Sequence, residues 1–354
     1  MMGDTATQEA SVAKTIDTSK RVLDIRNLYV WYKTHRGHAK VVNGVDFHIN
    51  AAEKVGLVGE SGCGKTTLMK MVLQVLDPKS IHVPEGEIFL KGHDVLQLDA
   101  ATLQEKRRKD VSMISQEPMA ALNPVFTIGA QMRDIIKYSG SFSNARKKDL
   151  NNMVTSAIGD VMISDPSRIL NAYPHQLSGG MRQRICIAMS LLTPRDLLIA
   201  DEPGTALDVT IQDQIHRLLR ALVDEKGRSL VMITHSFGVA RELVDRIYVM
   251  YAGEIIESAK TKDLFRNPCH PYTSGLLSCV PRLSGGGLST GIYGYVPDYI
   301  NPPAGCRFSL RCSKAMEKCF NEKPKMAEVE DEHTVSCFLY QNEKNDKTGN
   351  DEGR

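Results

Sequence analysis

The sequence predicts an α/β fold that carries an inserted helical subdomain and a separate C-terminal extension. Three observations lead to this prediction. Short segments that are apolar on both faces alternate with helical segments, as buried parallel strands do. A polar, helix-rich span occupies about 117–180, between the second and third of these strands. After about Ala259, repeated prolines break up the periodicity, which marks a different kind of structure.

The bulk composition narrows the class of protein. The chain has 354 residues, more than one compact core usually holds. A formal net charge of +2 gives no electrostatic reason to expect nucleic acid as a partner. No stretch approaches the ~18 consecutive apolar residues of a membrane span, and the first twenty residues lack the apolar run of a signal peptide. We therefore expect a cytoplasmic protein that must dock onto a membrane if it works at one.

The elements are expected in a definite order along the chain. The α/β domain should span 21–262 and the extension 263–340, with disordered polar tails at 1–20 and 341–354. A helix is expected at 66–76, directly after a glycine-rich turn. No internal repeat is found, which implies one such domain per chain. The predicted strands are 54–58, 111–115, 197–200 and 229–234.

The glycine-rich turn fits the P-loop spacing G-x-x-x-x-G-K-[ST] and lies between a strand and a helix. Its glycines let the backbone wrap around phosphates, and the helix that follows offers the positive end of its dipole. Lys65 can then reach the β- and γ-phosphates, and the Thr66 hydroxyl can ligate Mg²⁺. A P-loop predicts nucleotide binding but not the kind of nucleotide-binding protein. The predicted ATP-binding residues here are Gly59, Glu60, Ser61, Gly62, Cys63, Gly64, Lys65, Thr66 and Thr67.

A second motif, Leu177-Ser178-Gly179-Gly180-Met181, lies about 120 residues further on. Ser178 is a good N-cap for a helix that runs to Pro194. The capping serine and the two glycines leave several N–H groups free at a positive helix end, which predicts another anion site. By itself, the motif would equally suit an ordinary loop.

Polar residues follow three of the predicted strands. Asp201 and Glu202 close the third strand and should emerge beside the P-loop, where Asp201 would hold Mg²⁺ through water and Glu202 would polarise the attacking water. His235 ends the next strand, where it could contact the γ-phosphate. Gln116 follows the second strand, where its amide could reach Mg²⁺ or the water. A helix-start acidic pair, a structural histidine and a surface glutamine are the plainer alternatives.

In this order, the motifs resemble the complete motif set of ABC-transporter ATPases over about 22–259. The resemblance implies a P-loop (RecA-like) nucleotide-binding domain and a dimer. In such a dimer, ATP lies between the P-loop of one subunit and Ser178, Gly179 and Gly180 of the other. Asp208, in Ala206-Leu207-Asp208, matches the loop that communicates between the two sites. Tyr32 matches the aromatic residue that stacks on adenine, although Tyr29 or Trp31 could serve.

The closer resemblance is to the ATPases of oligopeptide and dipeptide importers, carried by 116–124, 177–184 and 267–273. It implies hydrolysis of ATP to ADP and phosphate coupled to solute import at the cytoplasmic face of the cell membrane. The implied partners are a second ATPase subunit in a heterodimer, two transmembrane permease subunits and, indirectly, an extracellular solute-binding protein. Two departures stand out: Gly204 occupies a position where these importers usually carry threonine, which should loosen the loop, and Cys63 replaces a common serine.

Four of the eight cysteines, Cys306, Cys312, Cys319 and Cys337, crowd the C-terminal extension. In a reducing compartment such crowding favours metal or cluster ligation over disulfides. Four thiolates can hold zinc or an iron–sulfur cluster, and four buried, unliganded cysteines remain an alternative. The spacing resembles the extension of peptide-importer ATPases, some of which carry a [4Fe–4S] cluster, so a cluster is expected and zinc is its rival.

Two rival functions are weighed. A non-transport ABC ATPase acting on DNA or the ribosome would need a long coiled coil or a second cassette, and neither is present in the sequence. Relatives of peptide importers also move oligosaccharides or nickel, and an ATPase subunit does not touch the cargo. A further expectation concerns Cys63: a helix N-terminus and a lysine beside it should lower its pKa and make an accessible thiol reactive, unless the loop shields the sulfur.

Overall fold

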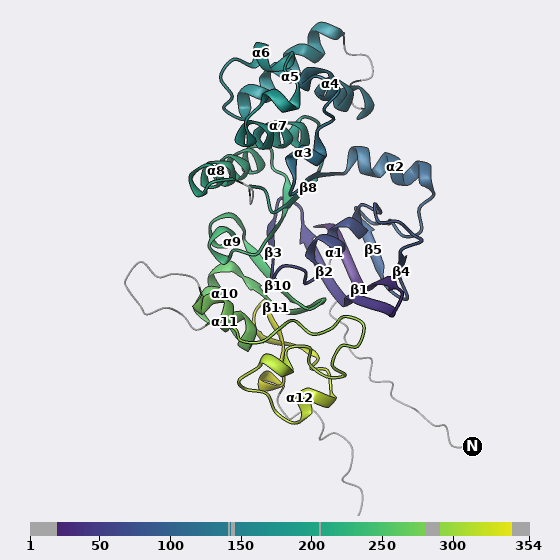
Figure 1. Cartoon of the computed structure of the whole chain (residues 1–354), viewed down its shortest axis with the longest axis vertical. Coiled ribbons are helices and arrows are strands. Elements are labelled where there is room, and N and C mark those ends of the chain that lie inside the picture. Colours follow the sequence, from purple (N-terminus) through teal and green to yellow (C-terminus); the bar gives the residue numbers. More distant parts are fainter. Residues whose placement is uncertain (1–19, 141, 143–145, 205–206, 280–290, 342–354) are drawn as a thin grey trace, which may run out of the picture.

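The computed structural model describes residues 20–140, 142, 146–204, 207–279 and 291–341 (Figure 1). The two predicted tails therefore fall almost entirely outside the described residues, as does Ala206. Two sheets, a helical lobe at one end and the C-terminal extension at the other make up the described chain (Figure 1).

An eight-stranded main sheet has the order β12-β13-β11-β10-β3-β9-β8-β7. The five strands from β10 to β7 are parallel, and β11, β13 and β12 extend the sheet in antiparallel fashion. All four predicted strands are confirmed to within one residue, and every residue of β8 and β9 is buried, as expected for central parallel strands. The strand bounds are β3 Lys54–Val58, β7 Val111–Ile114, β8 Leu197–Asp201, β9 Ser229–Thr234, β10 Arg246–Tyr251, β11 Glu254–Lys260, β12 Met326–Glu330 and β13 His333–Ser336.

A second, antiparallel sheet was not predicted. Its order is β2-β1-β5-β6, with β4 also paired to β1. The two longest strands form a hairpin whose register shifts several times, so the simple alternation of apolar and polar residues is interrupted. This irregularity hides the strands from pattern reading. The strands are β1 Arg21–Thr34, β2 Gly37–Asn50, β4 Ile81–His82, β5 Glu87–Leu90 and β6 His93–Asp94.

Helices pack around the sheets and form a lobe at one end of the molecule (Figure 1). The predicted helix at 66–76 is shorter than expected: α1 ends at Val72, because Gln74 takes a left-handed conformation with φ 49°. The lobe contains α4 Ile128–Tyr138, α5 Lys147–Asp160 and α6 Pro166–Leu170, and the short helix α3 Pro118–Ala121 contacts α7 Gly179–Leu191 instead. The helices between the sheets and the lobe or beside the sheets are α1 Lys65–Val72, α2 Ala100–Lys109, α7 Gly179–Leu191, α8 Val209–Glu225 and α9 Phe237–Leu243.

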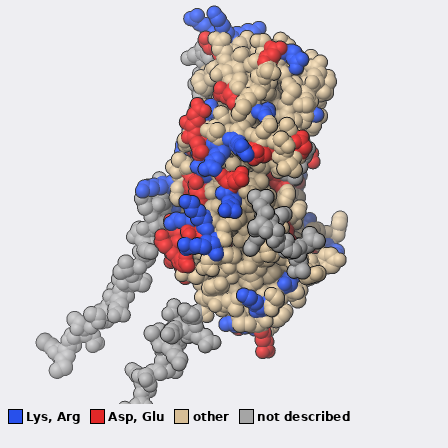
Figure 2. Space-filling view, turned by 90° about the vertical axis from the view of Figure 1, so that its left-hand side faces the viewer, with Lys and Arg blue, Asp and Glu red and all other residues tan. Residues whose placement is uncertain are grey.

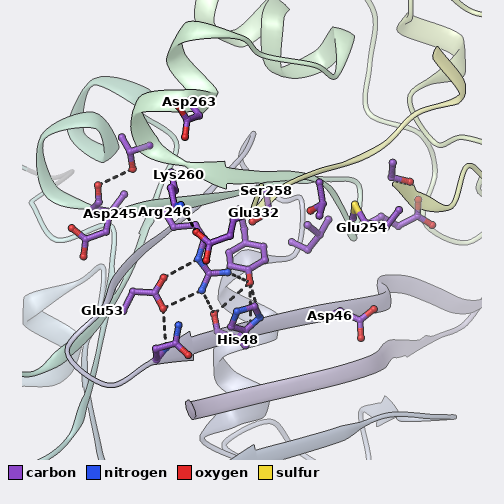
Figure 3. A pocket seen from close by; sticks show the side chains of 18 of the residues that line it. Asp46, His48, Glu53, Asp245, Arg246, Glu254, Ser258, Lys260, Asp263 and Glu332 are labelled. Atoms are coloured by element: carbon purple, nitrogen blue, oxygen red, sulfur yellow. Dashed lines mark hydrogen bonds and ion pairs between the residues drawn. The ribbon is translucent and has the colours of Figure 1, made fainter. Parts of the chain in front are cut away.

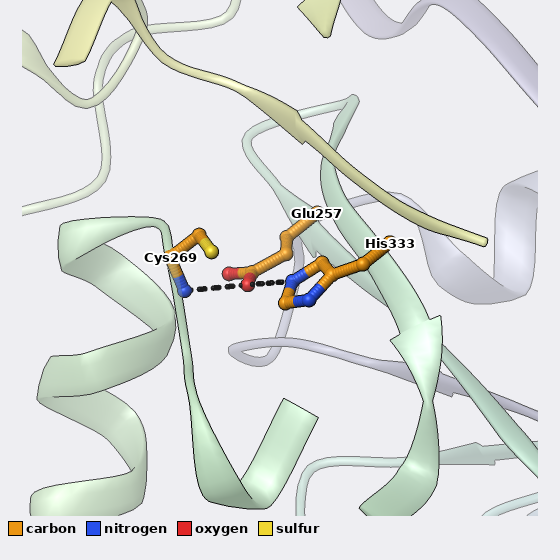
Figure 4. Close-up of side chains that lie close together, drawn as sticks. All are labelled: Glu257, Cys269 and His333. Atoms are coloured by element: carbon orange, nitrogen blue, oxygen red, sulfur yellow. Dashed lines mark hydrogen bonds and ion pairs between the residues drawn. The ribbon is translucent and has the colours of Figure 1, made fainter. Parts of the chain in front are cut away.

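The extension consists of short elements joined by loops. It comprises α10 Thr261–Arg266, α11 Pro271–Ser278, α12 Lys318–Asn321 and the strands β12 and β13. Glu257 of β11 ties these pieces to the main sheet: its fully buried carboxylate accepts hydrogen bonds from the Cys269 N–H (2.7 Å), the His270 N–H (2.9 Å) and Nε2 of His333 (2.8 Å) (Figure 4). One side chain thus holds both the start of α11 and strand β13.

The surface carries mixed charges. On the face shown in Figure 2, basic and acidic side chains are interspersed and do not gather into a field of one sign. No described helix is both long and apolar enough to cross a membrane.

Candidate nucleotide-binding and catalytic site

The P-loop connects the end of β3 to the start of α1, as predicted. Its backbone needs glycine at particular points: Gly62 and Gly64 have φ of 79° and 108°, and a Cβ on Gly59 would lie 2.1 Å from the Met250 carbonyl oxygen. The buried ammonium of Lys65 donates hydrogen bonds to the carbonyls of Gly59 (2.8 Å) and Glu60 (2.9 Å). The loop is therefore a closed turn with a lysine at its centre.

The acidic pair lies next to this loop. The Thr66 hydroxyl donates a hydrogen bond of 3.2 Å to Oδ1 of Asp201, which ends β8. Burial raises the pKa of Asp201 above its ordinary value, and the charge of neighbouring Glu202 adds to this, while Thr66 and Lys65 oppose it. A buried carboxylate that is destabilised in this way gains from a nearby cation. Thr66 and Asp201 thus fit the oxygen donors that Mg²⁺ prefers.

Glu202 brings two further predicted residues together. One carboxylate oxygen lies 3.1 Å from Nδ1 of His235, and the other accepts from Nε2 of Gln116 at 3.4 Å. The backbone of Glu202 is left-handed, with φ 47°, and its N–H is bonded to the Ile233 carbonyl in β9. Gln116, Glu202 and His235, each of which follows a different strand, therefore meet at one carboxylate.

The structure distinguishes the three candidates for contact with adenine. The Tyr32 hydroxyl lies 3.3 Å from Oγ1 of Thr67 in α1, the helix that follows the P-loop. Trp31 packs instead against two imidazole rings, those of His38 and His82. Tyr29 lines a different cavity. Of the three, Tyr32 is the one that contacts the helix after the P-loop.

Ser178 caps α7, as predicted, because its hydroxyl accepts the Met181 N–H at 3.3 Å. Helix α7 lies beneath the helical lobe and is separated from α1 in Figure 1. Asp208 similarly caps α8 by accepting the Ile211 N–H at 3.0 Å. Gly204 has φ 109°, a backbone in which threonine would be strained, so a glycine suits this turn for a reason that the sequence did not show.

The expectation of a reactive Cys63 is wrong. Its side chain is 1% exposed, and burial raises the pKa of the thiol above its ordinary value. Lys65 acts in the opposite direction, but its effect is smaller than that of desolvation. The fold of the loop shields the sulfur, which the sequence reasoning had weighed as the alternative.

The four cysteines of the extension line one small cavity of about 20 Å³. Backbone N–H groups of Phe308, Lys314 and Leu339 face the sulfurs of Cys306, Cys312 and Cys337 and act to lower their pKa, against a larger increase caused by burial. The Met316 N–H donates to Sγ of Cys319 at 3.4 Å. Within the described ranges, no three of these sulfurs lie within 4.8 Å of one another.

Glu257, Cys269 and His333 form a second buried group whose ligand atoms lie within 4.8 Å of one another (Figure 4). The Glu257 carboxylate already accepts three hydrogen bonds, one of them from the His333 ring. A metal ion would have to displace that ring bond and the proton it carries. We therefore interpret the group as a structural link between β11 and the extension.

Sequence reasoning missed a cavity of about 950 Å³ between the two sheets and the extension (Figure 3). Arg246 lines the cavity and forms an ion pair with Glu53 at 2.8 Å. It also donates a hydrogen bond to the Tyr248 hydroxyl, which is hydrogen-bonded to Nδ1 of His48. Neither the P-loop nor the strand ends that carry Asp201, Glu202 and His235 contribute to the lining. No motif marks these residues, and the strands β2 and β10, which carry His48, Arg246 and Tyr248, were not predicted.

Comparison with known families finds two matches. The family model described as "ABC transporter" matches residues 42–205, and the model described as "Oligopeptide/dipeptide transporter, C-terminal region" matches 256–319. The chain is 43% identical to the dipeptide transport ATP-binding protein DppD of Bacillus subtilis, over 90% of this chain and 95% of that protein. It is 41% identical to the oligopeptide transport ATP-binding protein AppD of the same organism, over 91% and 98% of the two chains.

Solved structures resemble the described fold. A dimeric post-hydrolysis structure of the ATP-binding cassette MJ0796, bound to ADP and Pi, matches with a TM-score of 0.61 and 26% identity, over 68% of this chain and 98% of that one. The cbiO1 protein from Clostridium perfringens matches with a TM-score of 0.58 and 22% identity, over 70% and 92% of the two chains, which supports the fold alone.

Proposed function

The chain belongs to the family of oligopeptide and dipeptide ABC-transporter ATP-binding proteins and is an ATPase, and we propose that it energises the import of di- and oligopeptides. The observation that carries the site assignment is the meeting of His235 and Gln116 on the Glu202 carboxylate, beside a P-loop. The peptide cargo rests on the relatives, which are transport ATP-binding proteins for dipeptides and oligopeptides.

We propose these roles for the residues of the site. The backbone N–H groups of the P-loop and the Lys65 ammonium bind the phosphates of ATP, and Tyr32 stacks on its adenine. Thr66, Asp201 and Gln116 would hold Mg²⁺, and the ion would neutralise charge on the phosphates. Glu202 accepts a proton from the attacking water, and His235 orients that carboxylate through the 3.1 Å contact.

We further propose that a complete site needs two subunits. Ser178, Gly179 and Gly180 begin a helix that Figure 1 separates from the α1 helix of the same chain. The positive end of α7 is therefore available to the nucleotide of a neighbouring subunit, and Asp208 would lie near that interface. A second ATPase subunit, in a heterodimer, and two permease subunits at the cytoplasmic face of a membrane complete the proposed assembly, with a solute-binding protein outside.

For the extension we propose a [4Fe–4S] cluster held by Cys306, Cys312, Cys319 and Cys337. Two features support it. Backbone N–H groups face all four sulfurs, as befits thiolates that bear charge. A single zinc ion with Zn–S of about 2.3 Å would draw the sulfurs closer together than they lie, whereas a cluster spreads its ligands. The division of the chain into an ATPase domain at 21–262 and an extension at 263–340 belongs to the same proposal.

The decisive test of the site compares two variants in the assembled transporter. Glu202→Gln should bind ATP as the wild type does but hydrolyse it at least ~10²-fold more slowly, because the general base is lost. Lys65→Ala should lose ATP binding itself. Near-wild-type turnover by Glu202→Gln would remove Glu202 from its role. Uptake of labelled dipeptide, nickel and oligosaccharide by vesicles that contain the transporter would distinguish the cargoes.

A further inference from the structure

The extension reaches the P-loop through three side chains that lie far away in the sequence. The Tyr272 hydroxyl accepts the Glu60 N–H at 3.0 Å, and the Tyr299 hydroxyl donates to the Gly62 carbonyl at 2.9 Å. Arg311 forms a two-pronged ion pair with the Glu60 carboxylate, at 2.8 and 3.0 Å. The nucleotide cradle is therefore held from outside as well as by β3 and α1.

The Arg311–Glu60 pair neutralises a negative charge inside the P-loop. Glu60 lies within the loop that must receive the negative phosphates, where an unpaired carboxylate would repel them. The Arg311 guanidinium is almost completely buried at 5% exposure, and it is fixed from behind by the carbonyls of Ile292 and Tyr293 and by the Tyr251 hydroxyl. The hydrogen bonds that Arg311 donates to Glu60 are the largest cause of the raised pKa of Arg311. Two parallel bonds to a fixed guanidinium also define where the carboxylate points.

We propose that Arg311 is a positioning residue for ATP binding: it neutralises Glu60 and holds the P-loop in the shape that accepts phosphates. The C-terminal extension thereby sets the nucleotide affinity of the ATPase domain. Arg311 touches Glu60 and acts on ATP through it. This inference rests on the assignment of the P-loop as the ATP site under the proposed function.

The test measures ATP affinity by titration with a fluorescent ATP analogue, and KM and kcat in the assembled transporter. Arg311→Gln should weaken ATP binding and raise KM about tenfold or more with a smaller change in kcat, because it leaves a partly buried carboxylate uncompensated beside the phosphates. Arg311→Lys should restore part of the affinity, since it keeps the charge but loses the two-pronged geometry. The matched control is Lys260→Gln, which removes an ion pair with Glu332 at 2.7 Å, away from the loop, and should leave KM unchanged.

A second substitution separates positioning from simple folding support. If Arg311 acts by neutralising Glu60, the double variant Glu60→Gln/Arg311→Gln should recover most of the lost affinity, because no unpaired carboxylate remains. No recovery, or an unchanged KM in Arg311→Gln, would overturn the proposal. Should Arg311→Gln fail to fold, Arg311→Lys alone decides: it keeps the charge but not the two-pronged geometry, so it should still raise KM, and a KM equal to that of the wild type would overturn the proposal. Lys65→Ala tests the ATP site independently of Arg311. If this variant bound ATP as the wild type does, the assignment of the P-loop as the ATP site would be refuted.

Discussion

The ATP site and the four-cysteine cavity are built on different kinds of support. Glu202, His235 and Gln116 follow the ends of buried parallel strands, and the Glu202 carboxylate lies 3.1 Å from His235 and 3.4 Å from Gln116. Three of the four cysteines lie in loops and Cys319 lies in the single-turn helix α12, and no three of their sulfurs, all in described residues, lie within 4.8 Å of one another. The ATP site is held by the core of the domain, whereas the cysteine cavity is formed mainly by loops.

This difference yields a general expectation. Substitutions at the strand ends should change chemistry and leave folding nearly intact, because the surrounding strands are fully buried and carry the stability. Substitutions of the cysteines should change the stability of the extension and its metal content first.

The largest expected effect is at Ser178. Ser178→Arg should reduce hydrolysis by the assembled transporter by at least ~10²-fold, the scale seen when an anion-stabilising group is lost, because the bulky side chain blocks the helix end that serves the neighbouring nucleotide. ATP binding to the isolated chain should stay unchanged. The measurements are turnover in vesicles and nucleotide titration of the single subunit. Loss of binding by the single subunit would show that Ser178 serves its own P-loop.

A second prediction concerns the cysteine cavity. Protein purified without oxygen should be brown and contain iron and acid-labile sulfide, and Cys312→Ser should lose both and melt at a lower temperature. Cys279→Ser is the matched control, since Cys279 is exposed and does not line the cavity. Metal analysis and thermal unfolding are the measurements. If the wild type contained one zinc ion per chain and no iron, the site would be a zinc site and not an iron–sulfur cluster.

A third prediction uses His270, whose Nδ1 accepts the Tyr272 N–H at the start of α11. Burial lowers the pKa of His270 to about 4, against a weaker opposing effect of Glu257. Its neutral form therefore stabilises the folded state fully above pH 6.5, and this contribution is lost as the pH falls from 6.5 to 4, at most about 3 kcal/mol. Thermal unfolding between pH 7 and 5 should show a steeper loss of stability in the wild type than in His270→Asn, which keeps a capping acceptor.

Parallel pH profiles of the wild type and His270→Asn would contradict this account of the extension. Part of the pH dependence should persist in the variant, because burial and the charge of Arg246 also lower the pKa of His48, in the antiparallel sheet, to about 4.

The smallest expected effect is at Cys63. A maleimide should label the exposed Cys279 and leave Cys63 almost unmodified in the folded chain, with or without ATP, because the Cys63 sulfur is buried and its pKa is raised. Peptide mapping after labelling measures this. Rapid labelling of Cys63 that ATP prevents would show that the P-loop opens far more than its packing indicates.

From the sequence, four of the five parallel strands could be predicted, and Gln116, Glu202 and His235 could be placed just after three of them. Short runs buried on both faces identify central strands, and parallel strands bring their C-terminal ends to one edge of the sheet. The antiparallel sheet was missed because register shifts in β1 and β2 interrupt the alternation. The contacts of Arg311 and Tyr299 with the P-loop were out of reach, since they join residues more than 230 positions apart that no motif connects. The pKa of Cys63 was misjudged because burial is a property of the whole fold.

Glu202 has a consequence for how this protein can change over generations. Its left-handed backbone, with φ 47°, costs a non-glycine residue on the order of 1–3 kcal/mol, and the buried strands around it bear that cost. Glycine would adopt the same backbone without strain, but it has no carboxylate to present to His235 and Gln116. Selection for stability alone would therefore favour glycine at this position. Only selection for ATP hydrolysis would retain the glutamate. A chain that no longer needed to hydrolyse ATP would be expected to lose Glu202 early.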